Sequence, residues 1–297
     1  MKLLLVNPNT TSSMTEKAAI AARFVASSGT EILASNPSDG PLSIEGYYDE
    51  VFSIPGLLEE IRKGAAVGCQ GTIIACFDDT GLDAARCQVA GPVVGICEAA
   101  VHLASMLSNS FSIVTTLNRS VPALEGLVLK YGMERHCQRV RASEVPVLDL
   151  EDTNAGGRKK IRDEVALALS KDRSEAIVLG CAGMVDLARD LSEEFQVPVI
   201  DGVTSAVKLV ESLVSLGLQT SKRNPFVSPR PRALRDRSRG SCRCHQYLVR
   251  QDSRDWRCTH QQPSCKKTLI HGLNRRWQDA YSSRLQHHEK NLHGAGR

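Results

Sequence analysis

Seven short apolar runs alternate with amphipathic segments over the first 222 residues of this 297-residue chain, and this alternation limits the fold more than any other feature. The runs are rich in Val, Ile and Leu, and they lack the regular polar residues of a strand with one solvated face. Buried strands separated by helix-length connections are typical of βαβ units and of a mostly parallel sheet. The runs are residues 2–7, 30–35, 71–76, 92–97, 110–116, 175–181 and 197–201. The predicted fold class is therefore α/β.

Two segments of the chain repeat one another. "TIIACFDDTGLDAARCQVAGPVVGIC" aligns with "AIVLGCAGMVDLARDLSEEFQVPVID", and in each an apolar strand ends in a cysteine, Cys76 or Cys181. A second strand begins with Pro-Val, at Pro92 in the first copy and at Pro198 in the second. A strand that ends in cysteine is therefore followed by the same order of elements twice.

The two halves also open alike, with "LLLVNPNTT" (3–11) and "FSIVTTLNRS" (111–120). We therefore expect two similar Rossmann-like parallel-sheet domains related by a pseudo-twofold axis, with the active site between them. The first domain is predicted to comprise residues 1–97 plus 203–222, because the last helix should pack back on the first half. The second domain is predicted to comprise residues 98–202.

The character of the chain changes near Lys222. Residues 1–222 carry 20 Lys+Arg and 28 Asp+Glu, whereas residues 223–297 carry 17 Lys+Arg and 5 Asp+Glu and show no strand or helix periodicity. We expect residues 223–297 to be a disordered basic tail whose removal after about Lys222–Pro225 leaves activity unchanged. The high content of Arg, Ser, Pro, His and Cys in this segment also suggests a shifted reading frame. Resequencing of the gene tests this hypothesis, and a confirmed frame through residue 297 would refute it.

Neither a metal site nor a specific nucleic-acid site is predicted in this tail. Its cysteines and histidines lack the C-x2-C spacing of zinc ligands, and net charge alone supports only non-specific binding to nucleic acid. The residues concerned are Cys242, Cys244, His245, Cys258, His260, Cys265 and His271.

No apolar run reaches the ~18–20 residues that a membrane helix requires. The apolar start of the chain ends at Asn7-Pro8, which is too early for the core of a signal peptide. We therefore expect a cytoplasmic protein without membrane contact.

Cys76 and Cys181 occupy equivalent strand ends. Ligands of open α/β sheets bind beyond the carboxyl ends of the strands, so two halves packed face to face would bring both thiols to one small molecule from opposite sides. A helix start after each cysteine should stabilise its thiolate. Such a pair suits a two-base racemase, in which one thiolate removes a proton from carbon and the opposite thiol returns one. We interpret the other body cysteines as packing residues, namely Cys69, Cys87, Cys97 and Cys137.

The segments "VNPNTT", "ACFDDTGLDAAR", "IVLGCAGM" and "PVIDGV" resemble the aspartate/glutamate/hydantoin racemase superfamily, and within it the branch that acts on hydantoins and allantoin. The resemblance covers about residues 1–222. It implies an enzyme without metal or other cofactor, in which Cys76 and Cys181 are the acid/base residues and 5-monosubstituted hydantoins are the substrates. It also implies a homo-oligomer, either a tetramer or a hexamer.

Loss of the C5 proton of a hydantoin leaves an enolate, so the site must supply hydrogen-bond donors near the ring oxygen. The predicted substrate-binding residues are Asn9, Thr10, Ile44, Phe77, Asp78, Thr115, Thr116, Ala182 and Gly183. Asp78 and its neighbour Asp79 suit either a role at the site or N-capping of the following helix, which is common for Asp after a strand.

Other functions fit parts of the same pattern. An allantoin or amino-acid racemase is the alternative within the superfamily, although a free amino acid requires cationic groups in turns that hold Asn, Thr and Asp. A decarboxylase or a cis-trans isomerase on the same fold is a further alternative, but decarboxylation of this type needs only one cysteine. A non-catalytic binding protein would tolerate alanine at both Cys76 and Cys181.

Overall fold

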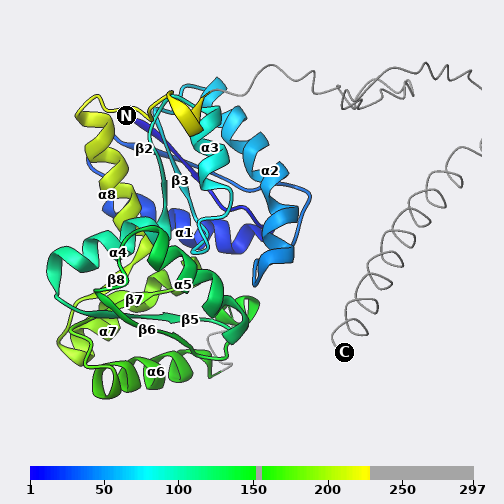
Figure 1. Cartoon of the computed structure of the whole chain (residues 1–297). Coiled ribbons are helices and arrows are strands. Elements are labelled where there is room, and N and C mark those ends of the chain that lie inside the picture. Colours follow the sequence, from blue (N-terminus) through cyan, green and yellow to red (C-terminus); the bar gives the residue numbers. More distant parts are fainter. Residues whose placement is uncertain (152–155, 228–297) are drawn as a thin grey trace, which may run out of the picture. The chain divides into compact units, whose positions relative to one another are not determined.

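The computed structural model describes residues 1–151 and 156–227, which contain two parallel four-stranded sheets covered by helices (Figure 1). The order of the first sheet is β2-β1-β3-β4 and that of the second is β6-β5-β7-β8. The first sheet consists of β1 (Lys2–Val6), β2 (Glu31–Ser35), β3 (Gly71–Ile74) and β4 (Val93–Gly95). The second consists of β5 (Phe111–Thr115), β6 (Cys137–Ala142), β7 (Ala176–Leu179) and β8 (Val199–Asp201). The predicted α/β class with two similar parallel sheets is confirmed, and the two sheets share one strand order.

Strand β6 was absent from the sequence prediction. Its sequence, CQRVRA, buries only Val140, and it lies at the edge of the second sheet, where it pairs with β5 alone. An edge strand with one solvated face does not need the continuous apolar run that marks the inner strands. The apolar-run criterion therefore finds inner strands and misses this one.

Helices connect the strands and cover both sheets. They are α1 (Ser12–Val25), α2 (Tyr47–Ala66), α3 (Leu82–Gln88), α4 (Ile96–Leu107), α5 (Val121–Lys130), α6 (Gly157–Lys171), α7 (Ala188–Phe195) and α8 (Gly202–Ser215). Short 3-10 helices also occur, namely η1 (Asn118–Ser120), η2 (Val147–Glu151), η3 (Ala182–Leu187) and η4 (Asn224–Phe226).

Helices α4 and α8 each follow a strand of one sheet and pack on the other sheet. Helix α4 follows β4 of the first sheet but contacts β7 and β8 of the second, whereas α8 follows β8 and contacts β3 and β4. The two helices also pack against one another between the sheets (Figure 1). The expected division into residues 1–97 plus 203–222 and residues 98–202 requires such crossings, and the domain boundaries themselves stay a prediction.

The start of α8 lies against the start of α4 at Gly202. A Cβ atom at Gly202 would lie 2.4 Å from the carbonyl oxygen of Ile96 and 2.7 Å from its Cβ. We expect Gly202→Ala to lower the free energy of unfolding by about 2 kcal/mol, because backbone must shift to admit the methyl group. Urea unfolding measures this loss. Gly126→Ala is the control, since a Cβ there meets nothing within 4 Å; a Gly202→Ala variant as stable as wild type would contradict the prediction.

The first residues of the predicted tail contact α3. Lys222 donates to the carbonyl oxygens of Arg86 and Cys87, and the thiol of Cys87 donates to the carbonyl oxygen of Pro225 at 3.3 Å. Residues 224–226 form η4 and lie against α3, while the boundary between the first half and the tail stays a prediction. The rest of the predicted tail, residues 228–297, lies outside the described residues.

Within residues 1–151 and 156–227, no helix is both long enough and apolar enough to cross a membrane.

Candidate active site

A pocket lies at the carboxyl ends of four strands, two from each sheet. It is formed by the segments that follow β1, β3, β5 and β7, and it encloses about 410 Å³ of empty space including its open mouth. This is the position that the ligand rule for open α/β sheets predicts. The pocket is lined by Asn7, Asn9, Met14, Ile44, Ala75, Cys76, Phe77, Asp78, Thr115, Thr116, Ser120, Val147, Gly180, Cys181 and Ala182. Both candidate catalytic cysteines line it, although β3 and β7 belong to different sheets.

The predicted residues outside the pocket lining are Thr10 and Gly183. The hydroxyl of Thr10 donates to the carbonyl oxygen of Pro41 at 3.2 Å and so joins the turn after β1 to the loop before α2. The carbonyl oxygen of Gly183 accepts the ammonium group of Lys17 at 2.6 Å. Thr10 thus links two loops, and Gly183 links η3 to α1.

Several lining residues were missed from the sequence. Asn7 belongs to the motif "NPNT", and its amide donates to Asn9 Oδ1 at 2.8 Å and to the Thr15 hydroxyl at 3.0 Å. The same motif from which Asn9 and Thr10 were selected could therefore have indicated Asn7 as well. Met14 and Val147 reach the pocket from α1 and from the start of η2, and no repeated pattern marks either of them.

The thiol of Cys76 is held mainly in its protonated form. Burial raises its pKa well above the usual value, and the negative charge of Asp78 adds to the rise. A hydrogen bond from the Thr80 hydroxyl to Cys76 Sγ, 3.5 Å long, opposes this rise, as does the backbone N–H of Asp78.

Burial also raises the pKa of Cys181, to about 11. The backbone N–H of Gly183 opposes this shift, because it donates to the sulfur and so stabilises the thiolate. The carboxylate of Asp78 raises the pKa of Cys181 as well, and the ammonium group of Lys17 lowers it. One carboxylate therefore acts on both thiols.

The expected stabilisation of the thiolate by a helix start occurs at Cys181 but not at Cys76. After Cys76 the chain forms a turn, in which the Asp79 N–H donates to the Cys76 carbonyl oxygen at 3.1 Å, and α3 begins only at Leu82. Cys181 does precede a helix start, that of η3, but burial outweighs the donor there. Both thiols are consequently weaker acids than the sequence suggested.

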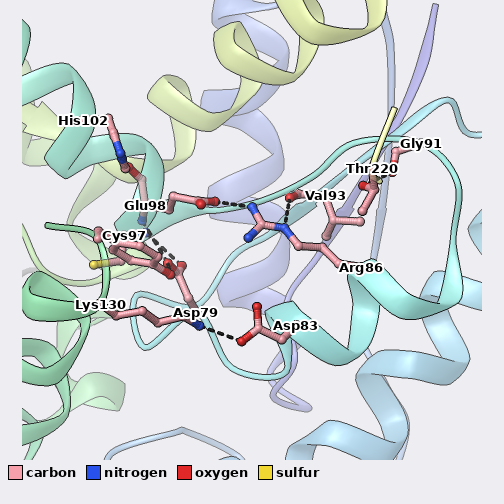
Figure 2. Close-up of polar contacts among 11 residues, drawn as sticks. Asp79, Asp83, Arg86, Gly91, Val93, Cys97, Glu98, His102, Lys130 and Thr220 are labelled. Carbon is pink, nitrogen blue, oxygen red and sulfur yellow. Dashed lines mark hydrogen bonds and ion pairs between the residues drawn. The ribbon is translucent and has the colours of Figure 1, made fainter. Parts of the chain in front are cut away.

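Asp78 and Asp79 have different environments. Asp78 lines the pocket, where burial raises its pKa to about 7 and the charges of Glu50, Asp79 and Asp49 add to the effect. Asp79 is a cap, but not for the helix that follows it. Its carboxylate accepts the N–H groups of Cys97 and Glu98 at the start of α4 (Figure 2). Sequence order alone would assign it to α3, whose N-cap is Gly81.

The fold and the paired thiols define a class of α/β racemases, and comparison with known proteins identifies the family. The family model described as Asp/Glu/Hydantoin racemase matches residues 3–210. The hydantoin racemase of Rhizobium meliloti is 51% identical over 233 residues, which cover 78% of this chain and 97% of that protein. The hydantoin racemase of Pseudomonas sp. (strain NS671) is 48% identical over 229 residues, which cover 77% of this chain and 92% of that protein.

A solved structure agrees with this assignment. The allantoin racemase from Klebsiella pneumoniae has a TM-score of 0.78 at 48% identity, covering 80% of this chain and 97% of that chain. The chain belongs to the Asp/Glu/Hydantoin racemase family, and it is a racemase. The resemblance of its four quoted segments to this family is confirmed.

Proposed function

We propose that the chain interconverts the D and L forms of 5-monosubstituted hydantoins without a cofactor, with Cys76 and Cys181 as its acid/base pair. The observation that carries this proposal is that both thiols line one pocket, each from the segment after an equivalent strand of its own sheet. The names of the two relatives with 51% and 48% identity support hydantoins as the substrate class.

The reaction needs one thiolate and one thiol. The thiolate takes the proton from C5, and the electron pair of the C–H bond moves into the ring as an enolate whose charge lies on the carbonyl oxygen. The opposite thiol then gives its proton to the other face of C5 and becomes the thiolate. The two cysteines exchange roles in each turnover, so atoms and charge balance without an added reagent.

Hydrogen-bond donors must stabilise the enolate oxygen. The hydroxyl of Thr115 donates to the carbonyl oxygen of Gly180 at 3.0 Å, so Thr115 holds the strand end that leads to Cys181. We assign the donor role to the hydroxyl of Thr116, with the backbone N–H groups of Phe77 and Ala182. Each of these residues lines the pocket.

Racemisation in D2O tests the proposal. Purified protein is incubated with D- or L-5-benzylhydantoin, while circular dichroism follows the optical activity and proton NMR follows the C5 proton. We expect both enantiomers to converge on the racemate with one deuterium at C5, faster than a blank without protein. The presence of EDTA should change nothing. No acceleration over the blank would refute the proposal.

Allantoin is the second candidate substrate, because the structure from Klebsiella pneumoniae is that of an allantoin racemase. Allantoin is itself a hydantoin and carries a polar ureido group at C5. The pocket presents the apolar side chains of Met14, Ile44, Phe77 and Val147, which favour an apolar C5 substituent. The ratio of kcat/KM for 5-benzylhydantoin and allantoin decides between the two.

Ile44 is expected to limit the size of the C5 substituent. It is 8% exposed, and its neighbour Glu45 accepts hydrogen bonds from Arg119 (2.5 Å) and from the backbone N–H of Val147 (2.9 Å). Because these bonds hold the loop in place, Ile44→Ala should leave room instead of letting the loop collapse. We expect the kcat/KM ratio of benzyl to methyl substrates to rise roughly tenfold. Leu42→Ala, at a side chain of the same loop that is 64% exposed, is the control, and an unchanged ratio for Ile44→Ala would contradict the assignment.

The homo-oligomeric state and the cytoplasmic location stay predictions. Exposed apolar side chains on α1, such as Ile20 and Phe24, support an assembly of several copies.

A further inference from the structure

Asp79 joins the loop that carries Cys76 to the half of the molecule that carries Cys181. Its residue is 5% exposed, and its carboxylate accepts the backbone N–H groups of Cys97 at 3.0 Å and Glu98 at 2.9 Å (Figure 2). The hydroxyl of Tyr131, at the end of α5, donates to the same carboxylate at 2.6 Å. Since α4 contacts β7 and β8 and α5 contacts β6, these three bonds connect the Cys76 turn to two helices that pack on the second sheet.

The same residue is closely coupled to the Cys76 thiol. The Asp79 N–H donates to the Cys76 carbonyl oxygen at 3.1 Å, and the next residue, Thr80, donates its hydroxyl to Cys76 Sγ at 3.5 Å. The φ angle of Asp79 is 46°, a left-handed conformation that Asp tolerates better than most residues. A Cβ at Gly95 would lie 2.1 Å from Asp79 Oδ1, so the glycine leaves space for this carboxylate.

The Cys181 loop has the same turn but a different connection to the opposite half. The Met184 N–H donates to the Cys181 carbonyl oxygen at 3.1 Å, so Met184 occupies the place that Asp79 has after Cys76. Met184 is fully buried and carries no carboxylate. The loop is linked to the first half by Lys17, whose ammonium group contacts the Gly183 carbonyl oxygen at 2.6 Å. Loss of the Asp79 bonds should therefore displace Cys76 and leave Cys181 in place.

We propose that Asp79 is a positioning residue that sets the reach of the Cys76 thiol to the substrate carbon, acting through the Cys76–Gly81 turn and the bonds to α4 and Tyr131. The inference rests on the proposed racemisation of hydantoins by two thiols. Asn cannot replace Asp79 in this role, because three donors converge on two carboxylate oxygens. Its NH2 group would face a backbone N–H in either orientation.

The test compares racemisation with exchange of the C5 proton in Asp79→Asn. With Cys76 displaced, we expect racemisation of 5-benzylhydantoin in both directions to fall about 100-fold, the scale of a misplaced reacting group. The enantiomer that Cys181 deprotonates should still exchange its C5 proton for deuterium, without inversion, within about threefold of wild type. A purely structural defect would lower exchange of both enantiomers equally, so equal losses would overturn the proposal, as would wild-type racemisation.

Two further variants keep the test decisive if Asp79→Asn folds poorly. Tyr131→Phe removes one of the three donors and should show the same imbalance between enantiomers, with racemisation reduced about tenfold. Asp83→Asn breaks the neighbouring ion pair between Asp83 and Lys130, which joins α3 to α5 at 2.8 Å but is largely exposed (Figure 2). This control should behave as wild type. Balanced losses in Tyr131→Phe would again overturn the proposal.

Alkylation by iodoacetamide separates this inference from the proposed function, because it needs no substrate. Peptide mass spectrometry gives the rate at Cys76 and at Cys181 in each variant. We expect Asp79→Asn to change the Cys76 rate at least threefold and to leave the Cys181 rate unchanged. If wild type exchanges no hydantoin, the proposed function fails, while a selective change at Cys76 still supports the positioning role. Equal changes at both cysteines, or none, count against it.

Discussion

Replacement of Cys76 or Cys181 by serine is expected to lower racemisation of both hydantoin enantiomers at least about 10³-fold while sparing proton exchange on one of them. A serine hydroxyl is too weak an acid to give the base that the cysteine supplies. The remaining thiolate can still remove the C5 proton from the enantiomer that faces it. The same sulfur then returns a deuteron to the same face, which gives exchange without inversion.

The two variants should spare opposite enantiomers. Deuterium uptake at C5 from D2O, measured together with optical activity for each pure enantiomer, distinguishes this result from a general loss of activity. Cys87→Ser is the matched control, because Cys87 is not a lining residue of the pocket and serine retains a donor for the Pro225 carbonyl oxygen. Full racemisation by either active-site variant would refute the two-base mechanism, and loss of all exchange in both would place the base elsewhere.

The inner strands and the repeat were predictable because they depend on local sequence. Strands buried on both faces require uninterrupted apolar residues, and "TIIA" and "AIVL" satisfy that requirement in both halves. Strand β6 does not, since Gln138 and Arg139 face solvent, so the same physical rule explains both the success and the omission.

The pocket could be predicted only in part. Cys76 and Cys181 mark their loops because each ends an apolar run, and both line the pocket, while their catalytic roles stay predictions. Thr10 and Gly183 were assigned from position alone, but neither lines the pocket: Thr10 bonds to the Pro41 carbonyl oxygen and the Gly183 carbonyl oxygen accepts the Lys17 ammonium group.

Contacts between distant segments left no trace in the sequence. Asp79 caps a helix that begins 17 residues later and bonds to Tyr131, which lies 52 residues away. The N-cap preference of Asp depends on local sequence, so it predicts that Asp79 caps the next helix along the chain. Only the packing of α4 and α5 beside the Cys76 turn decides which helix receives the carboxylate.

The charge of Asp78 should change how the racemisation rate depends on pH. Catalysis needs one thiolate, and the pKa values of both thiols are raised, so the wild-type kcat/KM should increase as pH rises from about 7 to 9, by up to about tenfold per pH unit. The pKa of Asp78 is raised to about 7. Its carboxylate therefore gains charge over the lower part of this range, and that charge raises the pKa of both cysteines. The wild-type increase should consequently be shallower between about pH 6 and pH 8 than above it.

Asp78→Asn removes this charge at every pH, so the ratio of variant to wild-type kcat/KM should be near one below pH 6, should increase through pH 7 and should level off above pH 8. The direction follows from sign alone: an ionised Asp78 disfavours thiolate, and a neutral amide does not. Rates for both enantiomers from about pH 5 to pH 10 give the ratio, with Asp163→Asn on the exposed face of α6 as control. If the Asp78 carboxylate instead binds a substrate N–H, its replacement should lower kcat/KM most at the pH values where Asp78 is ionised. The ratio of variant to wild-type kcat/KM would then fall through pH 7. The two roles of Asp78 thus predict opposite slopes, and a falling ratio would refute the electrostatic one.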